Sequence, residues 1–141
     1  MDKFAKCPCD SKLLYQKCCK QYHEGALPVV AEALMRSRYC AYALGLSEYI
    51  MDTTHPEHPE FTADRPRWQK EIENFVKHTR FDRLKVLHSE DGQDTSTVKF
   101  TAYLRQADLN ASFTETSTFE KVNGKWLYKS GVIESDPVES A

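Results

Sequence analysis

Val98-Lys99-Phe100-Thr101-Ala102-Tyr103-Leu104 decides the fold, because its apolar side chains fall at alternate positions. Successive side chains of a strand point to opposite faces, so this period of two predicts a strand with one buried face. The same period recurs elsewhere after Phe81. The sequence therefore predicts four strands in series, centred on Leu84 to Val86, Val98 to Leu104, Phe113 to Phe119 and Trp126 to Tyr128.

Turn signals separate these strands. Glu90-Asp91-Gly92 follows the first strand, and Val122-Asn123-Gly124 precedes the last. Asn-Gly accepts the positive φ of a type I′ turn, which is the turn that joins two antiparallel strands tightly. Consecutive hairpins of this kind predict an antiparallel meander.

The chain before Phe81 is typical of helices. Val29 to about Leu44 favours a helix that Gly45 interrupts, and Ser47 can cap a short helix that runs to Asp52. Asp64 can cap a further helix with Pro66 in its first turn, along which apolar residues repeat at helical spacing: Trp68, Ile72, Phe75 and Val76. Helices before strands indicate an α+β fold, with the helices packed on one face of a curved antiparallel sheet.

Length and composition limit the class of protein. The chain has 141 residues, 40% of them hydrophobic, and 19 basic against 21 acidic side chains. This is enough for one hydrophobic core, and the net charge of −2 argues against a uniformly basic nucleic-acid binder. No apolar run reaches the ~20 residues of a membrane helix, and the first residues resemble no secretion signal. We therefore expect a cytoplasmic protein without membrane association.

Four of the five cysteines lie close together near the start of the chain. Cys7, Cys9, Cys18 and Cys19 form a C-x-C-x8-C-C pattern, and only Cys40 lies elsewhere. Cytosolic thiols stay reduced, so two short-spaced pairs favour one structural Zn²⁺ over two disulfides. His23 is close enough to replace one sulfur. Reactive thiols, a vicinal disulfide at Cys18-Cys19 and chance clustering are the alternatives.

Basic residues surround this pattern. Residues 1–23 hold five lysines against two aspartates, whereas the end of the chain from Glu134 is acidic. A zinc ion with four thiolates would carry a local charge of −2, which nearby lysines would offset while favouring the thiolate form. The lysines in question are Lys3, Lys6, Lys12, Lys17 and Lys20.

The stretch Cys7-Pro-Cys-Asp-Ser-Lys-Leu-Leu-Tyr-Gln-Lys-Cys-Cys19 resembles the SEC-C zinc motif, with Asp10 and Lys12 where that motif usually has glycine. Further stretches resemble the YchJ-like bacterial family: Leu34-Met-Arg-Ser-Arg-Tyr-Cys-Ala-Tyr42, Thr54-His-Pro56, His78-Thr79 and Glu115-x-Ser117-x-Phe119. The resemblance implies a SEC-C module followed by a nuclear transport factor 2 (NTF2)-like, cystatin-like α+β domain. It implies no established biochemical activity.

Three segments follow from these patterns. Residues 1–24 form the zinc-binding module, residues 25–134 the α+β domain, and residues 135–141 an acidic tail. Many members of the family carry a second SEC-C motif at the C-terminus. Here Asp136-Pro137 resembles the start of that motif, but Val138 follows, so we expect a single zinc module in this sequence.

A second group of polar residues occurs in apolar surroundings. Arg36 and Arg38 point about 200° apart on one helix, so we expect at least one to be buried and to need a carboxylate. Glu115, which shares a strand face with Phe113 and Phe119, is the candidate partner. The pair is either purely structural or part of a ligand pocket, whose candidate residues are Arg36, Arg38, Tyr42, His55, Trp68, Glu115 and Trp126.

Three functions remain open. The favoured one is a binding or adaptor protein whose zinc module docks on an acidic protein or a ribosome-like surface, without catalysis. The second is a small-molecule enzyme of the isomerase, dehydratase or cyclase type that uses a carboxylate or His55 in the sheet cavity, a reading that depends on fold analogy. Direct nucleic-acid binding is the weakest. Domains of this type can also dimerise through an exposed sheet face.

Overall fold

The computed structural model describes residues 4–141, which form helices first and strands afterwards. Lys3 lies outside the described residues. The N-terminal segment contains the short helices η1 (Tyr15–Lys17) and α1 (Lys20–His23). Three longer helices follow: α2 (Ala31–Leu44), α3 (Ser47–Asp52) and α4 (Arg65–Lys77). The strands are β1 (Arg80–Glu90), β2 (Thr95–Gln106), β3 (Leu109–Asn110), β4 (Phe113–Val122) and β5 (Lys125–Ile133).

The sheet is the predicted antiparallel meander. Its order is β1-β2-β4-β5, and β3 pairs with β2 alone. The turn between β4 and β5 has positive φ at Asn123 (52°) and Gly124 (80°), as a type I′ turn requires. Register shifts interrupt the β1–β2 pairing twice and the β4–β5 pairing once, and such bulges increase the local twist and bend of the strands. Strand β3 was not predicted, because its two residues are too few to show a period.

The helices begin and end close to the predicted positions. The Asp64 carboxylate accepts the backbone N–H of Arg67 and so caps α4, whose Trp68 and Ile72 are buried. Gly45 adopts the left-handed conformation after α2, with φ at 75°. The prediction of Ser47 as an N-cap is wrong. Ser47 is the first residue of α3 and is buried, while Leu46 occupies the cap position without a side-chain hydrogen bond.

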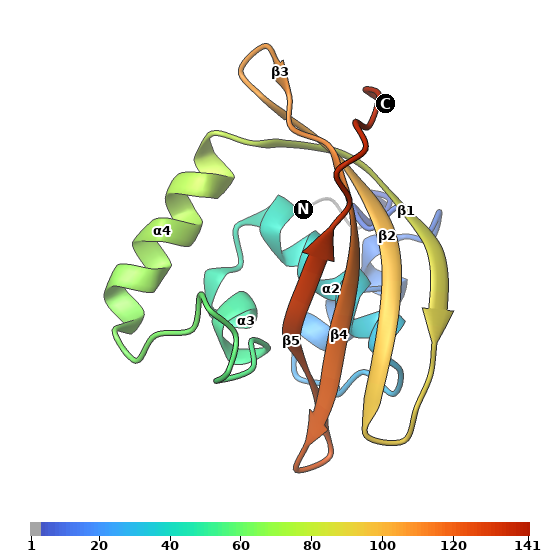
Figure 1. The fold of residues 1–141 in the computed structure, drawn as a ribbon, viewed down its shortest axis with the longest axis vertical. Coiled ribbons are helices and arrows are strands. Elements are labelled where there is room, and N and C mark those ends of the chain that lie inside the picture. The colour runs from blue at the N-terminus through green and yellow to red at the C-terminus, as the bar shows by residue number, and fades with distance from the viewer. Residues whose placement is uncertain (1–3) are drawn as a thin grey trace.

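Helix α2 packs against the sheet and organises the core. It contacts β1, β2 and β5, whereas α3 and α4 pack beside it around a smaller cluster that includes Ile50 and Trp68 (Figure 1). The main cluster joins Leu34 of α2 to Val98 and Phe119 of the sheet. Cys9 also belongs to this cluster, so the N-terminal segment shares the core of the α+β body. Within residues 4–141, no helix is long and apolar enough to cross a membrane.

Candidate metal centre

The N-terminal segment folds as a small knuckle whose two arms pair through the backbone. The N–H of Cys7 donates to the carbonyl of Leu13 at 2.8 Å, and the N–H of Tyr15 donates to the carbonyl of Ala5 at 2.9 Å. Asp10 and Lys12 reverse the chain between the arms with φ values of 63° and 75°. These are the two positions at which the SEC-C motif usually has glycine, the residue best suited to positive φ.

The second arm brings back the other cysteine pair. Cys18 follows η1, with its N–H bonded to the carbonyl of Tyr15 at 3.0 Å, and Cys19 directly precedes α1. The carbonyl of Cys19 accepts the N–H groups of Tyr22 and His23. Backbone hydrogen bonds at both ends of the pair thus orient its side chains toward the first arm.

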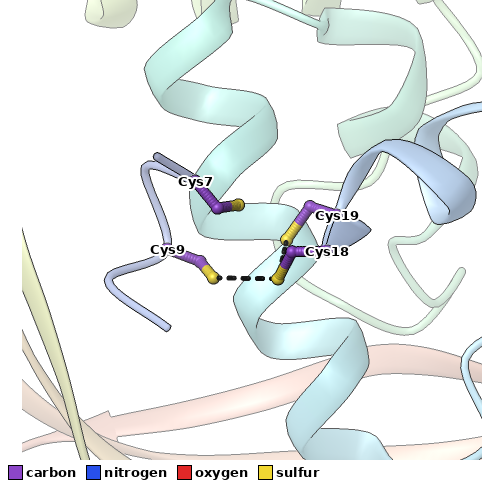
Figure 2. Close-up of side chains that lie close together, drawn as sticks. All are labelled: Cys7, Cys9, Cys18 and Cys19. Atoms are coloured by element: carbon purple, nitrogen blue, oxygen red, sulfur yellow. Dashed lines mark hydrogen bonds between the residues drawn. The ribbon is translucent and has the colours of Figure 1, made fainter. Parts of the chain in front are cut away.

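The structure brings Cys7, Cys9, Cys18 and Cys19 together, with all four sulfur atoms within 4.8 Å of one another (Figure 2). The Cys9 and Cys18 sulfurs are 3.7 Å apart, and those of Cys18 and Cys19 are 3.9 Å apart. A tetrahedron with zinc–sulfur bonds of about 2.3 Å has edges of about 3.8 Å. The sulfur spacing and soft thiol chemistry therefore fit a zinc ion. Three of the four cysteines are buried, and all are free thiols.

Cys40 reaches the same sulfur group from α2. Cys40 lies far from the other cysteines in the sequence, but its sulfur is 3.8 Å from that of Cys7. Cys40 is fully buried, as expected for a small apolar side chain. The neighbouring thiols of Cys19 and Cys40 hold the pKa of the Cys7 thiol well below its usual range. The only sequence signal for this proximity is its position on the inward face of an otherwise apolar helix.

His23, considered as a replacement ligand, lies outside the group of four sulfurs. Its Nδ1 lies 2.7 Å from the Tyr15 hydroxyl, and its Nε2 lies 2.8 Å from the Ser37 carbonyl of α2. Both ring nitrogens are therefore engaged. Burial lowers the pKa of His23, which favours the neutral ring. His23 thus fastens the knuckle to α2.

Arg36, predicted to line a pocket, contacts the knuckle and is not in the lining of the cavity described below. Its Nη1 donates to the carbonyl of Cys9 at 2.9 Å, and its Nε pairs with Glu32 at 3.0 Å. Glu32 accepts a further bond from Ser89 of β1. The arginine thereby links the first cysteine arm, helix α2 and the sheet.

A cavity of about 880 Å³ lies between α2, α4 and the sheet. Four of the predicted pocket residues line it: Arg38, Tyr42, Trp68 and Glu115. The side chains of Phe113, Glu115, Ser117 and Phe119 all reach it, as the alternation along β4 predicts. The cavity is therefore bordered by aromatic rings, by carboxylate groups and by two guanidinium groups, of which that of Arg38 is buried and that of Arg67 is exposed.

His55 and Trp126 do not line this cavity, although they were predicted to. His55 is buried, with Nε2 2.8 Å from a carboxylate oxygen of Glu120 and Nδ1 accepting the N–H of Glu57. It stabilises the turn that follows α3. The indole N–H of Trp126 donates to the carbonyl of Val29 at 3.0 Å and so anchors the start of α2.

The predicted ion pair between Arg38 and Glu115 does not form. Arg38 is only 7% exposed, as expected for the inward-facing arginine, but its Nη1 donates to the carbonyl of Ile50 and to the hydroxyls of Thr53 and Thr54. Neutral oxygens at the end of α3 thus bind Arg38 in place of the expected carboxylate. The pattern of helices and strands in the sequence does not reveal these hydrogen-bond partners.

Glu115 is held separately on β4. It accepts hydrogen bonds from the hydroxyls of Ser117 and Tyr128, and the ring of Tyr128 also contacts Arg38. The guanidinium carbon of Arg38 is 4.8 Å from the centre of that ring. The two charged groups therefore share the cavity without neutralising each other directly.

An α+β body of this topology with a cysteine knuckle on its first long helix defines the class of NTF2-like proteins that carry an N-terminal SEC-C motif. The family model described as "YchJ, middle NTF2-like domain" matches residues 30–131. A UPF0225 protein of Corynebacterium glutamicum is 37% identical over 130 residues, which cover 92% of this chain and 98% of that protein. The chain therefore belongs to the YchJ-like family.

Solved structures agree with this assignment. A SEC-C motif containing protein from Rhodopseudomonas palustris is similar with a TM-score of 0.77 and 33% identity, over 89% of this chain and 96% of that one. A SEC-C motif containing protein from Psychrobacter arcticus has a TM-score of 0.75 and 30% identity, over 96% and 86% of the two chains. This fold therefore occurs in proteins described as containing a SEC-C motif.

Proposed function

We propose that this protein is a zinc-stabilised interaction protein, in which one structural Zn²⁺ holds the knuckle against α2 and a partner docks on the basic face of that knuckle. The observation that carries the proposal is the convergence of four cysteine sulfurs at tetrahedral spacing. Four thiolates leave no coordination position open for water, so the ion would have a structural role. In the reducing cytoplasm, where we place the protein, such a site would persist where disulfides would not.

The exposed side of the knuckle supports a docking role. Lys6, Lys12 and Lys17 are exposed, and Leu13 beside them is 54% exposed. We name these four residues the knuckle face. Positive charge around an apolar side chain fits an acidic protein surface, to which it would be steered electrostatically. Tyr15, by contrast, turns inward to His23.

The enzyme alternative has less support from the geometry. The candidate base His55 lies outside the cavity and is bonded to Glu120. Glu115 remains within the cavity, but hydroxyl donors hold one of its carboxylate oxygens. Catalysis would be favoured by a base or an acid that a second titratable group orients toward the cavity.

Metal analysis tests the zinc part of the proposal. Purified wild-type protein should contain about one zinc per chain, as a single four-cysteine site requires. Cys18→Ser should lose the metal. Cys40→Ala is the matched control, because it removes a neighbouring thiol that lies outside the group of four. Zinc retained in Cys18→Ser, or lost equally in both variants, would contradict the assigned ligands.

Crosslinking in cells tests the docking part. Proteins crosslinked to the wild type are compared with those crosslinked to a variant with Lys6, Lys12 and Lys17 changed to Glu. In the matched control, three exposed lysines of the α+β body are changed to Glu instead: Lys70, Lys85 and Lys125. Loss of specific partners with the first variant alone is expected, and their purified complexes should weaken with salt. Equal partner sets for both variants would refute the knuckle face as the docking site.

A further inference from the structure

The cavity of the α+β body has the size and lining of a small-molecule site. Its volume of about 880 Å³ is within the range of ligand pockets. Aromatic rings from helices and strands make up much of its wall: Tyr42, Trp68, Phe81, Phe100, Phe113 and Phe119. Flat apolar molecules stack favourably on such rings. The chemistry of the two buried charged groups narrows the choice of ligand further.

The guanidinium of Arg38 has an unused hydrogen-bonding edge. Its three side-chain hydrogen bonds within the described residues all come from Nη1, to Ile50, Thr53 and Thr54. The Nε and Nη2 donors have no partner there, although Arg38 is nine-tenths buried and lines the cavity. This pair of parallel N–H groups is the fork that binds a carboxylate with two hydrogen bonds. An arginine already fixed at Nη1 would lose little conformational freedom on binding such an anion.

Glu115 offers the complementary group. It is 8% exposed, and its two hydrogen bonds both reach Oε2, which leaves Oε1 without a partner among the described residues. Gly131 of β5 makes room for this carboxylate, because an added Cβ would overlap it and would approach the Tyr128 hydroxyl to 2.6 Å. The cavity therefore contains two fixed polar groups that Tyr128 contacts. The Arg38 guanidinium can bind an anion, and the Glu115 carboxylate can accept a hydrogen bond from a ligand.

We infer that this cavity binds an organic carboxylate with a flat apolar body, whose carboxylate pairs with the Nε–Nη2 edge of Arg38 and whose hydroxyl or amino group donates to Glu115. The ligand body stacks on the aromatic wall. A buried guanidinium without a carboxylate partner favours an anion, because the pairing offsets the cost of its burial. The inference involves none of the four clustered cysteines, so it can fail while the zinc proposal stands.

Calorimetric titration of the full chain with cinnamate and with neutral cinnamamide tests the inference. The two probes share the same apolar body and differ in the anionic group. Cinnamate should bind at least about tenfold more tightly, as expected for hydrogen bonds between charged groups. Equal affinity, or no cinnamate binding at millimolar concentration, would overturn the inference. Inorganic phosphate binding as tightly as cinnamate would overturn the role of the apolar body.

Variants then assign the contacts. Arg38→Lys keeps the charge but removes the fork, and should weaken cinnamate binding about tenfold with little effect on cinnamamide. Arg36→Lys, on the same helix but turned toward Cys9, is the matched control and should bind as the wild type does. Of the hydroxycinnamate isomers, the tightest binder should bind more tightly than cinnamate, because its hydroxyl group donates to Glu115. The difference in affinity between that isomer and cinnamate should be smaller in Glu115→Gln. Unchanged affinities in Arg38→Lys and Glu115→Gln would overturn the assignment of these two residues as ligand contacts. If Arg38→Lys fails to fold, the comparison of cinnamate with cinnamamide in the wild type still tests the inference.

Discussion

Replacing Lys12 by glycine tests whether the turn between the two cysteine pairs is strained in this sequence. Lys12 has a φ of 75°, a conformation that glycine adopts freely and that costs other residues about 1–2 kcal/mol. Its side chain is 70% exposed and makes one ion pair, with Asp10 at 2.6 Å. The backbone strain at Lys12 is therefore offset only by an ion pair that solvent screens.

The expected net effect is a small stabilisation. Relief of strain is opposed by the greater backbone entropy of glycine in the unfolded chain, about 0.5–1 kcal/mol, and by loss of the exposed ion pair, a few tenths of a kcal/mol at this exposure. The balance is a gain of about 0.5 kcal/mol in the free energy of unfolding. Lys12→Ala keeps the strain and loses the ion pair, so it should be slightly destabilising.

Lys17→Gly is the matched control, because Lys17 is also an exposed knuckle lysine but lies in the helix η1. It should destabilise by about 0.5–1 kcal/mol. Urea unfolding at a fixed zinc excess measures all three variants, with linear extrapolation to water. If Lys12→Gly destabilises as much as Lys17→Gly, the turn is not strained and the reasoning from φ is refuted.

Three further predictions concern the knuckle and the cavity. His23→Ala should lower the free energy of unfolding by about 1–3 kcal/mol, because the Tyr15 hydroxyl and the Ser37 carbonyl lose their hydrogen-bond partner. The zinc content should stay unchanged, and zinc loss would indicate that His23 is a ligand. Burial lowers the pKa of His58, so the unfolded chain takes up its proton first. Stability should therefore fall as pH drops below about 6.5, less steeply in His58→Gln, and identical pH profiles would contradict this. Gly131→Ala should reduce the melting temperature by displacing Glu115, and an unchanged melting temperature would show that the strand can shift to make room.

The sequence was sufficient for elements with a strong local signal. The period of two placed the main strands, and Asn123-Gly124 placed a hairpin turn whose φ values agree. Asp64 and Pro66 identified the start of α4. The cysteine spacing predicted a group of four sulfurs that the structure brings together. The boundaries at residues 24 and 134 stay predictions.

The partners of buried polar groups could not be read from the sequence. Arg38 was expected to need a carboxylate, but the carbonyl and hydroxyl groups at the end of α3 satisfy it, and their convergence depends on how two helices pack. Arg36 was assigned to a pocket because both faces of α2 are apolar in sequence, whereas one of those faces is covered by the knuckle. Cys40 lies at the sulfur group because the knuckle covers that face of α2.

X-ray absorption at the zinc edge of the purified protein tests the central claim most directly, because it reports the atoms bound to the metal. The account predicts a single shell of four sulfur neighbours at about 2.3 Å, with no nitrogen or oxygen. A shell that contains nitrogen or oxygen ligands, or a protein that retains no zinc after purification, would contradict the assignment of the four thiolates.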